Sequence, residues 1–174
     1  MTRPTFAACV AVLLSTSLPV AYAASEPTSK QFVKDAIEDN LAEIKASELA
    51  LTKSDNPAVK AFAQRMIDDH TKSNTRLQTA AARYDIKVPD NSALMQRAEL
   101  KMLQMKSGAS FDKSYVAQMQ KSHEKAVKLF KEAANSSKID NDLKSLASDT
   151  LPTLEQHEHS AMQLASSEDT ASKH

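Results

Sequence analysis

The sequence predicts an all-α protein. Its 174 residues include one glycine, Gly108, whereas hairpin turns and phosphate-binding loops rely on glycine because it adopts positive φ at little steric cost. Apolar residues also recur three and four positions apart, which is the spacing of one helix face, rather than at every second position as in a half-buried strand. We therefore expect long helices along the chain.

The N-terminal residues have the pattern of a secretory leader. Arg3 precedes an apolar run over residues 6–20, and Ala21-Tyr22-Ala23 supplies the small-x-small pattern that signal peptidase reads. Ser, Thr and Pro interrupt the run, and it is shorter than the ~20 apolar residues of a transmembrane helix. We expect a signal peptide over 1–23, a short linker over 24–28, and an exported, periplasmic chain with no transmembrane anchor after cleavage.

Composition excludes several classes of function. The one cysteine, Cys9, is lost with the leader, so the exported chain has no disulfide, thiolate nucleophile or cysteine metal site. The 22 basic and 22 acidic residues are interspersed, whereas a nucleic-acid partner needs clustered Lys and Arg. We therefore expect no nucleic acid to bind. The remaining chain of about 150 residues suits a single domain, which we place at 29–165.

Two helices form the first predicted hairpin. The first spans about 29–54, and the second begins at Pro57, after Asn56 as a suitable N-cap, and ends before Val88-Pro89. Their apolar stripes are Phe32, Val33, Ile37, Leu41, Ile44 and Leu51, and Val59, Phe62, Met66, Leu77, Ala80 and Tyr84. The short connection makes the two helices antiparallel neighbours.

Residues 85–110 are a long connection with a short helix of their own. That helix carries Leu94, Met95, Ala98, Met102 and Met105, and we expect its methionines to fill the core. A second hairpin follows, with one helix over about 111–134 and another from about 140. The tail 166–174 is expected to be disordered.

This order of elements indicates a crossover bundle. Adjacent antiparallel helices need connections of only a few residues, so the longer connection suits a chain that crosses the bundle between the two hairpins. Such a topology is that of a ferritin-like four-helix bundle rather than of a simple up-and-down bundle. We therefore predict a ferritin-like four-helix bundle with a short extra helix in the crossover.

Three histidines mark the candidate site. His70, His123 and His157 each lie on the apolar stripe of a different predicted helix, where a titratable ring needs a polar partner. A helix rises ~1.5 Å per residue, so Glu43 and His70 lie at similar distances along their helices from the first hairpin turn. His123 and His157 likewise lie at similar distances from the second hairpin turn. We therefore predict that the four side chains meet in one layer. Glu48 is the alternative carboxylate, nearer the centre of the stripe but closer to the helix end.

The ordered motifs of the exported chain resemble a known family. They are Phe32-Val33, Ala42-Glu43, Asn56-Pro57-Ala58-Val59-Lys60, Phe62-Ala63, Met66, Asp69-His70-Thr71, Phe111-Asp112, Tyr115, His123, Phe130 and Leu151-Pro152-x-Leu154-x-x-His157. In this order they resemble the exported bacterial domain-of-unknown-function family 4142. The resemblance implies a ferritin-like four-helix bundle, and members of the family are often labelled predicted outer membrane proteins.

The histidine spacing excludes the dinuclear iron motif of many ferritin-like proteins. That motif needs Glu-x-x-His pairs, but Ile67, Gln120 and Leu154 stand three residues before the histidines. One carboxylate and three imidazoles suit a single divalent ion such as zinc, and copper, iron or manganese also accept these ligands. The first hypothesis is therefore a periplasmic bundle that binds one metal ion.

The second hypothesis needs no metal. Buried histidines also hydrogen-bond carboxylates and carbonyls, so the layer can be a polar network in a stress-related envelope protein that binds a protein partner. Asp69, Glu124 and Glu158 adjoin the histidines, but sequence neighbours point ~100° apart on a helix, and we expect these acids to face solvent. No residue pattern indicates nucleophilic catalysis, so we expect no enzymatic activity. Neither hypothesis specifies an oligomeric state.

Overall fold

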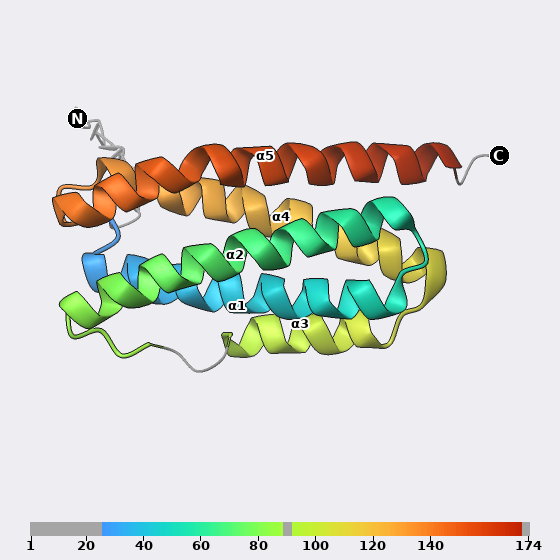
Figure 1. The fold of residues 1–174 in the computed structure, drawn as a ribbon, viewed down its shortest axis with the longest axis horizontal. Coiled ribbons are helices and arrows are strands. Elements are labelled where there is room, and N and C mark those ends of the chain that lie inside the picture. The colour runs from blue at the N-terminus through green and yellow to red at the C-terminus, as the bar shows by residue number, and fades with distance from the viewer. Residues whose placement is uncertain (1–25, 89–91, 172–174) are drawn as a thin grey trace, which may run out of the picture.

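A computed structural model describes residues 26–88 and 92–171, and this part of the chain forms five α-helices (Figure 1). They are α1 (Ser29–Lys53), α2 (Pro57–Arg83), α3 (Leu94–Gln104), α4 (Gly108–Asn135) and α5 (Asn141–Ala171). The described residues contain no strand, so the all-α prediction is confirmed. None of the described helices is long and apolar enough to cross a membrane. The predicted signal peptide lies outside the described residues.

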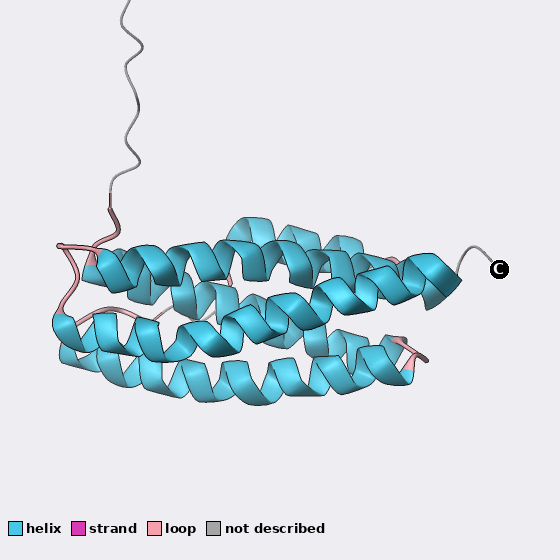
Figure 2. Ribbon diagram, turned by 90° about the horizontal axis from the view of Figure 1, so that it is seen from above, coloured by secondary structure: helices cyan, strands magenta, loops and turns pink. Residues whose placement is uncertain are grey.

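Polar groups hold both hairpin turns. The Asn56 side chain accepts a hydrogen bond from the Ala58 amide at 2.9 Å, and Pro57 occupies the first turn of α2, where its missing N–H leaves no helical bond unmade. At the other turn, the Glu26 carboxylate accepts hydrogen bonds from Ser136 Oγ and the Ser137 amide, at 3.2 Å each. α1 packs along α2 and α4 along α5, with their axes close to one common direction (Figure 2).

The connection between the hairpins places α3 on the outside of the bundle. α3 packs against α1 and α4, and Figure 1 shows it alongside α1 and away from α5. Leu103 is buried in this contact, and the Gln96 side-chain amide donates a hydrogen bond to the Asp39 carboxylate of α1. The chain thus forms two hairpins joined by a crossover with its own short helix, while the ferritin-like classification stays a prediction.

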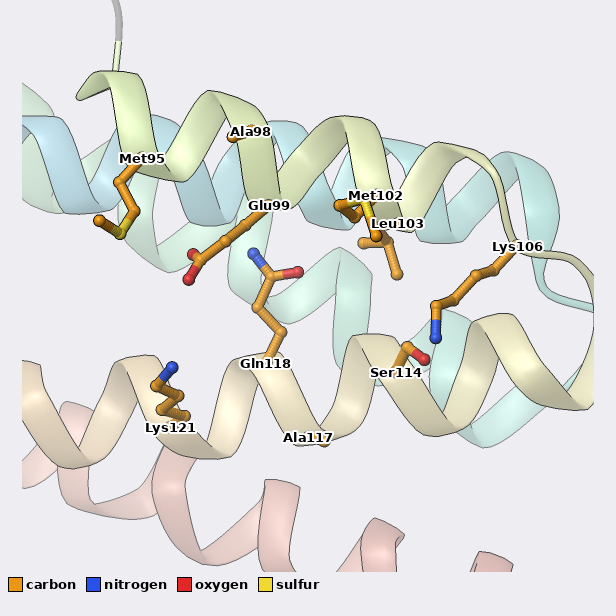
Figure 3. A pocket seen from close by; sticks show the side chains of 10 residues that line it. All are labelled: Met95, Ala98, Glu99, Met102, Leu103, Lys106, Ser114, Ala117, Gln118 and Lys121. Carbon is orange, nitrogen blue, oxygen red and sulfur yellow. The ribbon is translucent and has the colours of Figure 1, made fainter.

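The methionines of α3 do not fill the core, so that expectation is wrong. Met95, Met102 and Met105 are 74%, 62% and 83% exposed. Figure 3 shows Met95 and Glu99 extending from α3 toward α4, over a groove of about 500 Å³. The four long helices already fill the core with their own apolar stripes, so α3 buries only a narrow face.

The core consists of two apolar clusters with polar residues between them. One cluster includes Phe32, Ile37, Leu77, Phe130 and Leu143, and the other includes Val59, Phe62, Met66, Phe111 and Met119. The buried residues between the clusters include Asn40 and Glu43 on α1, His70 and Asn74 on α2, His123 on α4 and His157 on α5. We call these six residues the polar layer. The predicted site therefore lies midway along the bundle.

One helix end agrees with expectation, since α2 stops before Val88-Pro89, and another does not. α2 ends at Arg83, and Asp85 follows at φ 48°, a left-handed conformation that does not continue a helix. α5 runs on to Ala171, so residues 166–171 are helical although we expected them in a disordered tail. Leu164 and Ala165 pack against the second apolar cluster, which holds this end of α5 in place. Residues 172–174 lie outside the described residues.

Candidate metal centre

The bundle brings the three predicted histidines together. His70, His123 and His157 project from α2, α4 and α5 and are 2%, 0% and 1% exposed. Each follows an apolar core residue by one helical turn, which places it on the buried stripe: Met66, Met119 and Leu154 respectively. The ring centroids are 5.3–5.4 Å apart in all three pairs.

One nitrogen of each ring faces the other two rings. His123 Nε2 lies 3.3 Å from His70 Nε2 and 3.3 Å from His157 Nδ1. One ligand atom from each of the three histidines lies within 4.8 Å of the others. Three donor atoms from three helices therefore converge on one point.

The other nitrogen of each ring has a hydrogen-bond acceptor. His70 Nδ1 donates to Asn40 Oδ1 at 2.9 Å, His123 Nδ1 to the Met119 carbonyl at 2.9 Å, and His157 Nε2 to Asp69 Oδ2 at 3.1 Å. These oxygens can only accept, so the outer nitrogens carry the hydrogens and, in neutral rings, the inner nitrogens carry lone pairs.

The Asn40 amide is itself held in one orientation. Its Nδ2 donates to Ser73 Oγ and to Asn74 Oδ1, at 3.1 Å each, so its oxygen faces His70. This orientation makes Asn40 an acceptor for the ring and fixes the tautomer of His70.

Glu43 lies beside two of the rings. Its Oε2 is 2.9 Å from His70 Nε2 and its Oε1 is 3.6 Å from His123 Nδ1, while Ser122 Oγ donates to Oε1 at 2.6 Å. Burial raises the pKa of Glu43, but the nearby histidines and the bonds from His70 and Ser122 outweigh it and hold the pKa well below its usual range. Glu43 is therefore a buried carboxylate, whereas Glu48 is exposed.

His157 is a neutral base at neutral pH. Burial lowers its pKa to about 4, and the neighbouring His70 and His123 act in the same direction, against the hydrogen bond to Asp69. Its inner nitrogen therefore keeps a lone pair across the physiological range.

Sequence reasoning missed two partners of the rings. Asp69 was expected to face solvent, and that expectation is wrong: it points away from its neighbour His70, as helix geometry requires, but it reaches His157 on α5. Asn40 was not among the candidate site residues. Neither contact has a signal in the sequence, because each depends on how two helices are rotated against one another.

The family of the chain follows from its sequence. Residues 15–164 match the family described as Domain of unknown function (DUF4142). The chain belongs to the DUF4142 family. No protein of curated function matches it.

Several solved structures have the same fold. This DUF4142 chain is similar to a DUF305 protein from Streptomyces coelicolor, with 14% identity, a TM-score of 0.69, and 82% of this chain and 94% of that one covered. It is also similar to CopM in a Cu(II)-bound form, with 19% identity, a TM-score of 0.69 and coverage of 82% and 99%. The Ag-bound form of CopM has 20% identity, a TM-score of 0.65 and coverage of 80% and 95%. At these identities the likeness shows the fold alone.

The polar layer of this DUF4142 protein offers ligands rather than a nucleophile. Neutral imidazoles and a carboxylate suit divalent first-row metals. Hydroxyl groups near the layer are engaged locally: Ser122 donates to Glu43, and the Tyr115 hydroxyl lies 2.9 Å from Ser47 Oγ. The three histidines of the layer could therefore hold a metal ion.

Proposed function

We propose that this protein is an exported metal-binding bundle that holds one divalent cation, with His70, His123 and His157 as ligands and Glu43 as the fourth. One observation carries the proposal: each ring donates a hydrogen bond from its outer nitrogen and turns its inner nitrogen toward the other two rings. Histidines that bind metals have this arrangement, because the outer hydrogen bond fixes the tautomer and orients the ring.

The inner distances suit a metal ion. Imidazole nitrogens bind zinc at ~2.0–2.1 Å, so two of them at tetrahedral corners lie ~3.3–3.4 Å apart. The inner nitrogen of His123 lies 3.3 Å from those of both His70 and His157. These two separations therefore match those of ligands around a tetrahedral ion, and the three ligand atoms all lie within 4.8 Å of one another.

Electrostatics also favour a cation. With neutral rings, the buried Glu43 carboxylate leaves one negative charge among converging lone pairs, and a buried charge without compensation is strongly destabilising. Either a proton or a metal ion can compensate it. In the metal-free protein a proton between His70 Nε2 and Glu43 Oε2, which are 2.9 Å apart, can compensate the charge, and a bound metal ion would take its place.

Copper and zinc are the first ions to test. Imidazole suits both, and the affinity order of first-row metals favours copper. CopM, which shares the fold, has a Cu(II)-bound and an Ag-bound form, which adds weight to copper. The leader expected at residues 1–23 supports a periplasmic location, where the protein would bind or store metal without catalysing a reaction.

The test is the metal content of the exported chain purified without chelators or an affinity tag. We expect about one equivalent of bound copper or zinc, and a higher melting temperature when that metal is added, because a ligand of the folded state stabilises it. His123→Gln should lose the metal while circular dichroism shows that it stays helical. The matched control is His159→Gln, which changes an exposed histidine of α5 and should keep the metal.

The alternative hypothesis predicts a different result. If the layer is only a polar network, the purified chain will contain less than about a tenth of an equivalent of metal, and added copper or zinc will leave its melting unchanged. That pair of results would refute the metal-binding proposal.

A further inference from the structure

A cavity leads from the surface to the polar layer. It has a volume of about 280 Å³, lies between α2 and α5, and is lined on the inside by His70 and His157 and toward the surface by Arg76 and Asp149. Two of the four proposed ligands are thus reached from one cavity between α2 and α5.

The cavity exists because of the residues that face each other between α2 and α5. Tight packing holds α2 to α1 and α5 to α4 within the hairpins, whereas α2 and α5 belong to different hairpins. Short polar side chains line the space between them, among them Ser73, Thr150 and Thr153. These small side chains leave a passage where large apolar residues would have closed the core.

Carboxylates line the cavity from its opening at the surface to the ring of His157. Asp149 on α5 forms an ion pair with Arg76 on α2 across the mouth, at 3.2 Å. Deeper in the cavity, Asp69 is paired with Lys72 at 3.4 Å and accepts the hydrogen bond of His157 at 3.1 Å. The Arg76–Asp149 pair is largely exposed, and exposed pairs are weak, so it can open readily.

We propose that a hydrated divalent cation reaches the histidines through this α2–α5 cleft, and that the Arg76–Asp149 pair at its mouth sets the rate of access. This inference rests on the proposed function. The size fits: an ion with six waters of ~30 Å³ each takes roughly 180 Å³, less than the cavity volume. The charges fit as well, because Asp149 attracts a cation and Arg76 repels it.

The test is the rate at which copper or zinc loads into the metal-free protein, followed by stopped-flow competition with an optical indicator. At low ionic strength, Arg76→Ala should load about threefold faster and Asp149→Asn about threefold slower, because each changes one charge near the path of a divalent ion. Both effects should shrink in high salt, which screens charges at the surface.

A second ion pair provides a matched control. Arg83 and Asp142 bridge the same two helices at 2.9 Å, seven residues along each helix from Arg76 and Asp149, and neither lines the cavity. Arg83→Ala and Asp142→Asn should therefore leave the loading rate unchanged.

A blocking experiment tests the path without changing a charge. The exported chain is expected to lack cysteine, so Thr153→Cys inside the cavity can be labelled with a bulky neutral maleimide. The label should slow loading at least tenfold, whereas the same label on Ser145→Cys, on the same helix but outside this cavity, should not.

The outcomes separate this inference from the proposed function. If the unchanged protein binds no metal, the proposed function fails. If it binds one equivalent but Arg76→Ala and Asp149→Asn alter the rate no more than the control pair, or in the same direction, the cleft is not the path. Unhindered loading of the labelled Thr153→Cys variant would overturn the inference in the same way.

Discussion

The pH dependence of folding in the metal-free protein tests whether His157 is a neutral buried base. Burial lowers its pKa to about 4 from the ordinary value of 6.5. Between these pH values the unfolded chain binds a proton that the folded chain does not. The contribution of the neutral His157 ring to stability is therefore complete above pH 6.5 and falls as the pH drops toward 4. At 1.36 kcal/mol per pKa unit, this loss is roughly 3 kcal/mol.

Asp39 has the opposite effect on the pH dependence of stability. Burial raises its pKa to about 7 from 3.8, with Glu43 and Asp35 adding to the effect. The folded protein then holds a proton that the unfolded chain has released, so this contribution is present at low pH and is lost as the pH rises toward 7. The two contributions are of similar size and nearly cancel. The role of His157 must therefore be measured as a difference between variants.

His157→Gln removes the titrating ring and keeps a neutral polar side chain. Urea unfolding of the metal-free protein and the variant between pH 4 and 6.5 should give a stability difference that changes by roughly 3 kcal/mol, with the unchanged protein losing more on acidification. The exposed control His159→Gln should show no such change with pH. A difference between the unchanged protein and His157→Gln that stays constant within ~0.5 kcal/mol would refute the reasoning.

Three other substitutions test neighbouring features. Asp39→Asn should make the free energy of unfolding fall more steeply on acidification below pH 7. The slope of this free energy against pH should change by the equivalent of about one bound proton, and an unchanged slope would contradict the raised pKa of Asp39. Asp69→Asn should weaken metal affinity ~10–100-fold in an indicator competition. The control Asp68→Asn, which changes an exposed neighbour, should leave the affinity unchanged. Equal effects of the two substitutions would show that Asp69 does not act on the metal through His157. Phe130→Ala should lower the urea-unfolding free energy by ~3–5 kcal/mol, because Phe130 is buried and packs edge-on against Phe32 at 5.1 Å; a loss below ~1 kcal/mol would place it outside the core.

Most of the fold could be predicted because local signals mark the helix ends. Asn56-Pro57 defines the start of α2, and the apolar spacing of Phe32 and Ile37 defines the buried face of α1. The exposure of Met95 and Met105 could not be predicted, because an amphipathic pattern indicates that a helix packs but not how much facing surface the other helices leave free. The end of α5 was also missed, since its polar sequence does not reveal the packing of Leu164 that supports it.

The level of the site along the bundle could be predicted from the sequence, but its hydrogen bonds could not. The rise of a helix is constant, so distance from a hairpin turn placed Glu43, His70, His123 and His157 in one layer. The structure brings the three histidines together and places Glu43 beside His70 and His123. Their roles as ligands stay a prediction.

The sequence by itself determined the all-α class, the two hairpins, the crossover and the level at which the histidines meet, because these depend on spacing along single helices. The tertiary structure alone decided that Asn40 and Asp69 orient two of the rings, that Glu43 rather than Glu48 is buried beside them, and that a cleft opens between α2 and α5. Those features depend on the rotation and separation of helices from different hairpins. Such quantities result from packing of the whole core, and no local stretch of sequence encodes them.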